Sequence, residues 1–253
     1  MSDIESLPLL LKQLNLSGIK EHWQTDASAA ERENLSYGQY LAGLCNKELS
    51  LRKQRRIERL IKTSKLPPSK TLDSFSFKEI QSINPAQITS LSTNADWIRQ
   101  AHNLIIFGPS GVGKTHLASA IAYRLIEQGI RVLFSQTTTL VQQLQKAHNQ
   151  YCLPEAIAKL SRIDLLILDD IGYVKRTEAE TNVLFELIAA RYESQSMIIT
   201  SNQPFSQWDQ IFPDSVMAVA AIDRLVHHAT IINAEGESYR KNKTINLYVK
   251  DET

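Results

Sequence analysis

The feature that most constrains this chain is one short segment rich in glycine, Gly108-Pro109-Ser110-Gly111-Val112-Gly113-Lys114-Thr115. It fits the pattern G-x-x-x-x-G-K-[ST] at every fixed position. An apolar run, 104–107, precedes it, and an alternating small and apolar stretch, 117–122, follows it. This order predicts a strand, a phosphate-binding loop and a helix whose first amides face an anion. A plain glycine turn is the alternative, but the strand and helix on either side favour the phosphate site.

The side chains of this loop have separate predicted roles around a nucleotide. Lys114 is expected to reach the β- and γ-phosphates, and Thr115 is expected to ligate Mg²⁺. ATP and Mg²⁺ are therefore the expected cofactors. The residues expected to bind the nucleotide are Gly108, Pro109, Ser110, Gly111, Val112, Gly113, Lys114, Thr115 and His116.

Length and composition limit the classes to which the chain can belong. With 253 residues, 43% of them hydrophobic, it can form one full α/β domain and a smaller element. No run approaches a membrane span and the start lacks a signal-peptide layout, so we expect a cytoplasmic protein. The two cysteines, Cys45 and Cys152, lie far apart, which argues against a disulfide framework and a zinc site.

The first part of the chain is predicted to be helical. Four leucines between Leu7 and Leu14 recur at helical spacing, and a small apolar segment, 18–23, follows them. Ser36 and Gln39 form a capping box that opens a long helix, which Pro67-Pro68 ends. The chain is thus predicted to divide into a helical N-terminal domain that binds DNA or a partner (1–65), a linker and lead-in with one helix near 95–101 (66–102), and an ATPase domain (103–253).

From Asn103 onward, strand-like and helix-like segments alternate. The predicted strands are 104–107, 130–134, 164–169 and 197–200, and the predicted helices are 137–148, 154–162 and 177–194. Alternation of this kind predicts an α/β fold, in which a parallel sheet of the P-loop class is sandwiched between helices.

Two carboxylates end the most apolar of these strands. Because the carboxyl ends of parallel strands share one edge of the sheet, this strand delivers its acids beside the phosphate loop. Asp169 is expected to hold Mg²⁺, directly or through water, and Asp170 to orient or deprotonate the attacking water. A solvated Asp-Asp turn is the alternative, and the upstream loop favours the site.

Three other polar side chains are candidates for the same site. Asn202 follows the next strand and is placed to contact the γ-phosphate or the lytic water, although an ordinary turn also fits. Arg224 is the candidate for an arginine that a neighbouring subunit supplies, and a surface arginine paired with Asp223 is its alternative. Arg240 is a candidate for a contact to nucleotide within its own subunit, with an exposed residue near an edge strand as the alternative.

A pair of histidines, His227 and His228, suggests a metal site. Adjacent positions on a helix do not face one site, and no acid follows four residues on. We therefore interpret the pair as surface or interface histidines.

Charge is unevenly distributed, although the net charge is only +1. Residues 1–46 contain three Lys or Arg against six Asp or Glu, whereas residues 47–65 contain eight against two. Such a local excess is typical of phosphate contact, and a solvated basic helix face is the alternative. The basic residues are Lys47, Arg52, Lys53, Arg55, Arg56, Arg59, Lys62 and Lys65.

Several segments together resemble a known family, the AAA+ ATPases of the IstB/DnaC group, and most closely its IstB-type helper ATPases of insertion sequences. They are GPSGVGKTHLA (108–118), LLILDDIGY (165–173), ITSNQPF (199–205), DRLVHHA (223–229) and GESYR (236–240). The likeness spans about residues 71–250. It implies a catalytic set of Lys114, Asp169, Asp170, Asn202 and Arg224, with Thr115 and Asp169 as metal ligands. It also implies an inserted helical segment, 138–162, whose possible DNA-backbone contacts are Lys146, Asn149, Lys159 and Arg162.

One departure from the wider AAA+ pattern concerns Asp170, where most members have Glu. Because Asp is one methylene shorter, its carboxylate stands farther from the water, which suggests slow, switch-like hydrolysis.

The resemblance implies an ATP-dependent homo-oligomer that assembles on duplex DNA and delivers target DNA to the transposase of the same element. A DnaC-like replicative helicase loader is the alternative, and it would bind single strands and a helicase. A nucleotide-gated adaptor without physiological hydrolysis is a third possibility from another class. A small-molecule kinase is disfavoured because neither an acceptor site nor a lid is evident.

Overall fold

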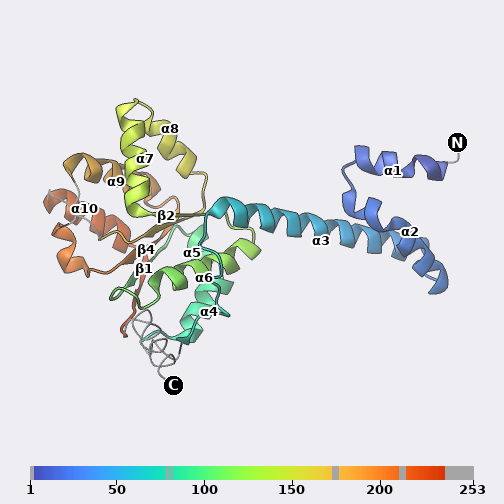
Figure 1. The fold of residues 1–253 in the computed structure, drawn as a ribbon, viewed down its shortest axis with the longest axis horizontal. Coiled ribbons are helices and arrows are strands. Elements are labelled where there is room, and N and C mark those ends of the chain that lie inside the picture. The colour runs from blue at the N-terminus through green and yellow to red at the C-terminus, as the bar shows by residue number, and fades with distance from the viewer. Residues whose placement is uncertain (1–2, 78–79, 81, 173–176, 211–214, 237–253) are drawn as a thin grey trace, which may run out of the picture. The chain divides into compact units, whose positions relative to one another are not determined.

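The computed structural model describes residues 3–77, 80, 82–172, 177–210 and 215–236. The chain forms two compact units, Met1–Arg59 and Leu60–Thr253 (Figure 1). No helix in this described part combines the length and the apolar character that crossing a bilayer requires.

The N-terminal unit is made of helices, as the sequence predicts. It contains α1 (Asp3–Gln13), α2 (Ser17–Arg32) and most of α3 (Tyr37–Ser64). Leu11, Ile19 and Leu44 form its small buried core. The predicted capping box before α3 is confirmed, because Gln39 N–H donates to Ser36 Oγ at 3.3 Å and Ser36 N–H donates to Gln39 Oε1 at 2.8 Å.

The apolar segment 18–23 belongs to the 16-residue helix α2, whose full length the sequence pattern did not define. A carboxylate from α3 caps this helix. The amide groups of Gly18 and Ile19 donate to Glu48 Oε2 at 2.6 and 3.2 Å, and Arg52 Nε donates to Glu48 Oε1 at 2.7 Å. The first two bonds satisfy amides that a helix start leaves without partners.

The second unit is built around a five-stranded sheet whose paired neighbours are all parallel, in the order β2-β3-β4-β1-β5. Its strands are β1 (Asn103–Phe107), β2 (Val132–Gln136), β3 (Leu165–Asp169), β4 (Ser196–Ser201) and β5 (Ala229–Asn233). Every residue of β1, β3 and β4 is buried, which fits central strands covered on both faces. The predicted α/β fold is confirmed, although β2 begins two residues later than predicted and β5 was not predicted.

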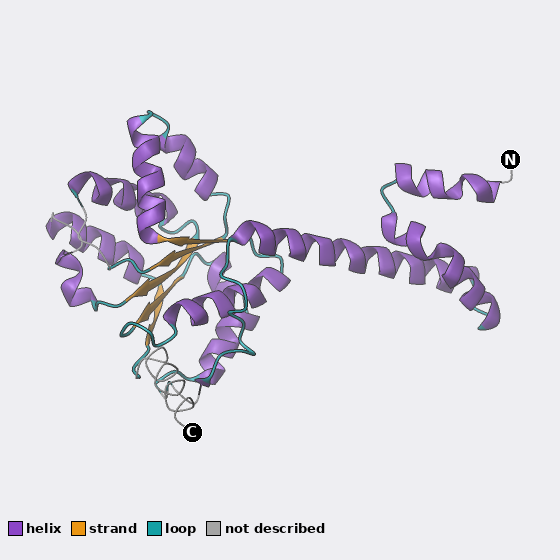
Figure 2. Cartoon of the chain, viewed as in Figure 1, coloured by secondary structure: helices purple, strands orange, loops and turns teal. Residues whose placement is uncertain are grey.

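Helices form a layer on each face of the sheet (Figure 2). They are α4 (Pro85–Thr93), α5 (Asp96–Arg99), α6 (Lys114–Glu127), α7 (Thr137–Asn149), α8 (Leu153–Leu160), α9 (Glu178–Arg191), the short 3-10 helix η2 (Phe205–Gln210) and α10 (Ser215–Val226). The α7, α9 and α10 helices bury apolar side chains in one core with the strands. On the other face, α6 packs against the strands and against α4.

Local signals explain where several of these helices begin and end. Asn84 caps α4 by accepting from Ala86 N–H at 2.9 Å, and Gly129 follows α6 with a φ of 88°. Thr177 and Glu180 form a capping box at α9. Helix α4, within the connector, was not predicted, and the helix predicted near 95–101 is the four-residue α5.

Candidate functional site

The predicted phosphate loop lies between β1 and α6, at the carboxyl edge of the sheet. Gly108, Gly111 and Gly113 have φ angles of 150°, 89° and 95°, which side-chain-bearing residues rarely adopt. A methyl group on Gly108 would lie 2.2 Å from the carbonyl oxygen of Ala234, so this position has no room for a side chain. The loop therefore requires glycine for both its conformation and its packing.

Lys114 is the first residue of α6 and is buried. Its Nζ donates hydrogen bonds to the carbonyl oxygens of Gly108 at 2.8 Å and Pro109 at 2.9 Å. These bonds hold the ammonium group against the loop, which is where a cation can meet phosphate oxygens.

Asp169 connects the loop to the neighbouring strands. Thr115 Oγ1 donates to Asp169 Oδ2 at 3.1 Å, and Thr200 Oγ1 donates to Asp169 Oδ1 at 2.6 Å. The two residues predicted to ligate Mg²⁺ therefore touch. Thr200, at the end of β4, was not predicted to have a role, and only the pairing of β3 with β4 brings it to Asp169.

Burial raises the pKa of the Asp169 carboxyl, and the nearby charge of Asp170 raises it further. The hydrogen bonds from Thr200 and Thr115 and the charge of Lys70 act in the opposite direction but do not cancel the shift. A buried carboxylate of this kind gains from a cation, because a cation offsets the cost of its desolvated charge. Two oxygen ligands, from Thr115 and Asp169, also suit the preference of Mg²⁺ for oxygen.

Asp170 differs from Asp169 in its surroundings. It is exposed, has a φ of 55°, and lines the pocket beside the phosphate loop. Its amide donates to Thr200 Oγ1 at 2.9 Å, so the same threonine fixes both acids. The exposed carboxylate is available to a water molecule in the pocket.

Asn202 directly follows β4, which lies between β1 and β3 in the sheet. Its side chain is exposed, and a methyl group on Gly172 would lie 3.3 Å from Asn202 Oδ1. Asn202 therefore lies beside the loop that follows Asp170. It is not among the described residues that line the pocket.

The pocket has a volume of about 300 Å³ and includes a wall that the motifs did not predict. Lys70, Ser74, Phe75, Ser76 and Ile80, all from the lead-in segment, supply this wall. The other lining residues are Ser110, Gly111, Val112, Gly113, Lys114, Thr115, His116 and Asp170. The resemblance at 71–75 was the available signal, but it gave no role to any of these side chains.

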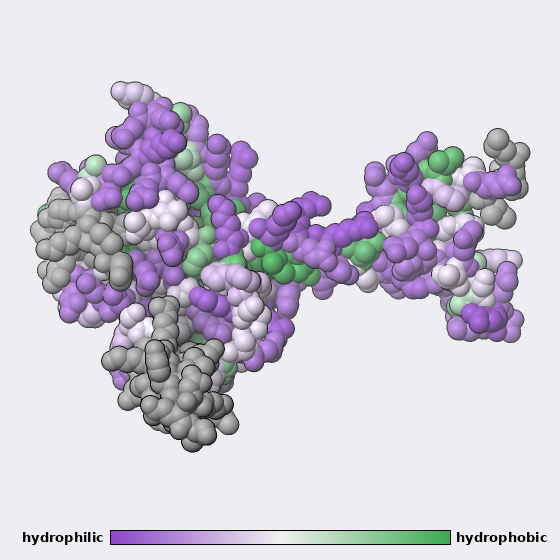
Figure 3. Space-filling view, in the orientation of Figure 1, coloured by the Kyte–Doolittle hydropathy of each residue, from purple (hydrophilic) through white to green (hydrophobic). Residues whose placement is uncertain are grey.

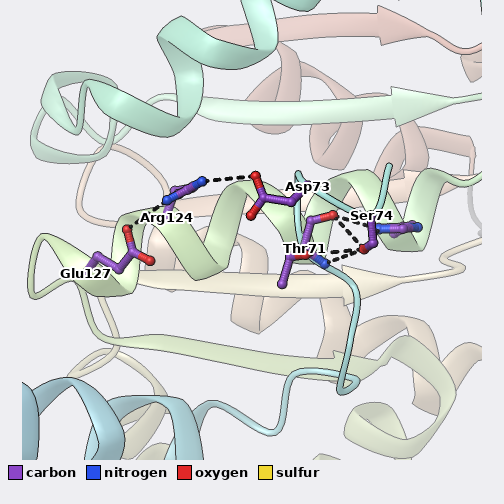
Figure 4. A network of polar contacts seen from close by, with 6 residues as sticks. Thr71, Asp73, Ser74, Arg124 and Glu127 are labelled. Carbon is purple, nitrogen blue, oxygen red and sulfur yellow. Dashed lines mark hydrogen bonds and ion pairs between the residues drawn. The ribbon is translucent and has the colours of Figure 1, made fainter. Parts of the chain in front are cut away.

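His116 fastens the lead-in segment to α6. Its Nε2 is hydrogen-bonded to the carbonyl oxygen of Thr71 at 2.9 Å and to Ser74 Oγ at 3.2 Å. Figure 4 shows a second attachment, in which Arg124 of α6 pairs with Asp73 while Ser74 bonds back to Thr71. His116 thus lines the pocket while its ring nitrogen bonds to protein groups.

Arg224 lies on α10, where it is half-buried. Its Nη1 donates to the carbonyl oxygen of Ala220 at 3.0 Å, and its guanidinium lies 5.0 Å from the ring centre of Phe185. It is not among the described residues that line the pocket of its own chain. Arg240, the other predicted arginine, lies outside the described residues.

His227 and His228 are exposed, as predicted for surface histidines, but they do not lie on a helix. Helix α10 ends at Val226 and β5 begins at Ala229, so the pair forms the turn between them. Ligand atoms of His227, His228 and Glu193 lie within 4.8 Å of one another. The acid comes from another turn, which is why spacing along the sequence did not reveal it.

Comparisons with known proteins agree with this arrangement. A family profile described as IstB-like ATP binding protein matches residues 9–246. An insertion sequence ATP-binding protein of Sinorhizobium fredii is 48% identical, over 96% of this chain and 82% of its own. The ATP-binding protein of insertion sequence IS5376 from Geobacillus stearothermophilus is 39% identical, over 90% of each chain.

Among solved structures, the DnaC helicase loader has a TM-score of 0.51 and 21% identity, over 66% of this chain and 97% of that one. This likeness shows that the chain shares the fold of that protein.

Proposed function

The chain belongs to the family of IstB-like ATP-binding proteins, and from that premise we propose that it assembles on duplex DNA and delivers this DNA to a transposase. Family membership makes it an ATPase associated with insertion sequences. The observation that carries the proposal is the joining of Thr115, Asp169 and Thr200 beside the phosphate loop, within a chain that matches this family almost throughout.

Each residue of the proposed catalytic set has a separate task. Lys114 and the loop amides bind the β- and γ-phosphates. Thr115 and Asp169 would hold Mg²⁺, which would neutralise charge developing on the phosphates. Asp170 orients the attacking water and accepts its proton, and Asn202 contacts the γ-phosphate or that water.

Substituting Asp170 tests this assignment. Asp170→Asn keeps a residue that tolerates the left-handed conformation but removes the base. We expect ATP binding to remain while turnover falls by about 10²-fold or more. Steady-state phosphate release, with ATP affinity measured in parallel, checks it. Turnover at the parent rate would remove Asp170 from the mechanism.

For DNA, we propose contact along α3, where three of the basic side chains have identified bonds within the helical unit. Arg52 bonds to Glu48 and to the carbonyl oxygen of Asn15, while Arg55 bonds to Ser17. Lys47 forms an ion pair with Asp26 at 2.6 Å. These three side chains stabilise the helical unit itself. A variant that lacks them could lose DNA binding simply because the unit unfolds.

Lys53, Arg56 and Arg59 are exposed on the same helix, and we choose these three to test phosphate contact. In the space-filling view, hydrophilic residues cover much of α3, with apolar patches between them (Figure 3). Phosphate contact by such residues does not depend on DNA sequence and weakens with salt.

A charge-reversal experiment separates this proposal from a merely solvated helix. We expect Lys53→Glu/Arg56→Glu/Arg59→Glu to weaken duplex binding across sequences and to flatten the salt slope by about 0.9 per lost contact. The matched control, Lys12→Glu/Lys20→Glu/Arg32→Glu, makes the same charge change on α1 and α2 of the same unit. Fluorescence anisotropy at saturating ATP measures both. If the two triple variants bind duplex DNA with the same affinity and salt dependence, we would instead assign the phosphate contacts to Lys146, Asn149, Lys159 and Arg162.

The same assay distinguishes the helper role from a DnaC-like helicase loader. A helper of transposition binds a duplex more tightly than a single strand of equal length, and sediments as an ATP-dependent homo-oligomer. It also retains the transposase encoded by the same element only when ATP and duplex DNA are present. Preference for single strands together with retention of a replicative helicase would favour the loader.

A further inference from the structure

The turn between α10 and β5 lies at the amino edge of the sheet, opposite the phosphate loop. His227 and His228 precede β5, Glu193 precedes β4, and His102 precedes β1. Because β4, β1 and β5 are neighbours in that order, three separate loops bring these side chains together. None of the four belongs to the nucleotide pocket, so the proposed ATPase mechanism leaves them without a role.

Among the described residues, Glu193, His227 and His228 form the one group of three or more potential ligands that could share a metal ion. Their ligand atoms lie within 4.8 Å of one another. On a tetrahedral zinc ion with bonds of about 2.0–2.1 Å, ligand atoms lie about 3.4 Å apart. All three side chains are exposed, so small rotations of their side chains can close the difference without moving the backbone.

Neighbouring groups orient these side chains in the way metal ligands require. The Tyr192 hydroxyl is hydrogen-bonded to His227 Nδ1 at 3.0 Å. When the phenol oxygen accepts this bond from His227 Nδ1–H, the Nε2 lone pair of His227 is left for a metal. Outer groups that fix a histidine tautomer in this way are typical of metal sites.

The backbone around His228 is also fixed. Its carbonyl oxygen accepts from Asn103 N–H at 2.7 Å, and its ring stacks on His102 with 5.2 Å between centres. The buried Asn103 side chain bonds to the carbonyl oxygen of Leu225 at 3.0 Å and accepts from Met197 N–H at 2.9 Å. The end of α10, β4 and β1 are thereby joined behind the turn, so the ligand positions are held by regular structure.

We propose that Glu193, His227 and His228 bind one Zn²⁺ ion at the amino edge of the sheet. Two imidazoles and one carboxylate are a donor set that zinc accepts, and water completes the coordination. The ion links the turn before β4 to the turn before β5. Binding is independent of nucleotide, because the phosphate loop lies at the other edge.

The test is zinc titration of the full, untagged chain after removal of metals by a chelator. Cys45→Ser/Cys152→Ser serves as the parent, because both thiols are exposed and thiolates are themselves metal ligands. Isothermal titration should show one Zn²⁺ per chain, with or without saturating ADP. Zinc should raise the melting temperature, and Co²⁺ in its place should give the visible absorption of a four-coordinate site without sulfur charge transfer.

Matched variants identify the ligands. We expect Glu193→Gln and His228→Asn each to weaken zinc binding by about tenfold or more, and Tyr192→Phe to weaken it by about tenfold through the orientation of His227. His148→Asn, an exposed histidine on α7, should bind as the parent does. Melting temperatures without zinc show whether each variant is folded. Absence of zinc uptake by the parent, or parent affinity in both Glu193→Gln and His228→Asn, overturns the proposal.

Discussion

At the scale of single residues, Asp169 shows how a site adapted to a charged ligand weakens the protein without that ligand. Its carboxylate is buried and has a raised pKa, chiefly through burial, so the nucleotide-free fold favours the protonated form. A carboxyl in the unfolded chain titrates near about 3.9. The stability that Asp169 contributes is therefore complete below that pH and is lost as the pH rises through the folded pKa.

Asp169→Asn should consequently raise the melting temperature of the nucleotide-free protein at neutral pH. The amide keeps an acceptor for Thr200 and can donate to the Thr115 hydroxyl, yet carries no charge. The gain should shrink as the pH falls toward 4, and ATP with Mg²⁺ should stabilise the variant less than the parent. Thermal melts across a pH series measure this, with Glu186→Gln, an exposed carboxylate on α9, as control. A lower melting temperature for Asp169→Asn at neutral pH would contradict this account.

At Gly108, close packing against the backbone of Ala234 requires glycine even without a bound ligand. Gly108→Ala places a methyl group 2.2 Å from a backbone oxygen of Ala234 at a φ of 150°. We expect a loss of about 1–3 kcal/mol in stability from backbone strain alone, together with weaker ATP binding. Gly38→Ala is the control, since nothing lies within 4 Å of its added methyl group, and it should not destabilise the protein. Urea unfolding and ATP titration of both variants decide the matter.

At the scale of elements, the N-terminal unit depends on a cap that crosses between helices. Burial alone would raise the pKa of Glu48, but hydrogen bonds from Arg52, Ile19 and Gly18 outweigh it and lower the pKa. The stability that Glu48 adds is present above its unfolded pKa, near about 4.3, and is lost as the pH falls through the lower folded pKa. Asp169 and Glu48 thus respond to pH in opposite senses.

Glu48→Gln should loosen α2 without affecting the nucleotide site. The loss of a charged acceptor for two amides should cost about 1–2 kcal/mol, mostly at neutral pH. Hydrogen exchange in the full chain should therefore accelerate at the amides of α2 by roughly tenfold, while exchange in β1, β3 and β4 stays unchanged. Glu58→Gln, on the same helix, is the control. Equal protection of α2 in the two variants would show that the cap contributes little.

At the scale of the whole molecule, each active site of the proposed oligomer needs a residue from a neighbouring subunit. Arg224 is half-buried on α10 and bonds to its own helix, and it is absent from the described lining of its own pocket. We therefore propose that it acts on the nucleotide of a neighbouring subunit. Such an arginine acts on developing charge, so its loss affects turnover more than ATP binding.

Arg224→Ala should bind ATP normally and lose turnover by on the order of 10³-fold. Mixed in equal amounts with Lys114→Ala, it should recover activity at roughly a quarter of interfaces, since each variant supplies what the other lacks. ATPase rates across mixing ratios measure the recovery. Phe185→Leu, which removes the ring beneath the guanidinium, tests whether packing explains the loss. No recovery at any ratio would make the role of Arg224 internal or structural.

The sequence by itself determined the phosphate loop and the alternation that makes an α/β fold. Both are local properties, because the loop's turn, amides, lysine and threonine all occur within eight consecutive residues. The extent of α2 was not predicted, because its start depends on a distant contact. The start of α2 is capped by Glu48, about thirty residues away in the sequence, and no local sequence pattern predicts a partner so distant.

Only the tertiary structure decided which distant side chains meet. Thr200 contacts Asp169 because β3 and β4 pair in parallel register. The lead-in segment lines the pocket because His116 is hydrogen-bonded to it. Glu193, His227 and His228 gather because two turns lie at one edge of the sheet. Contacts of this kind depend on strand order and register, which long-range packing determines and local periodicity does not encode.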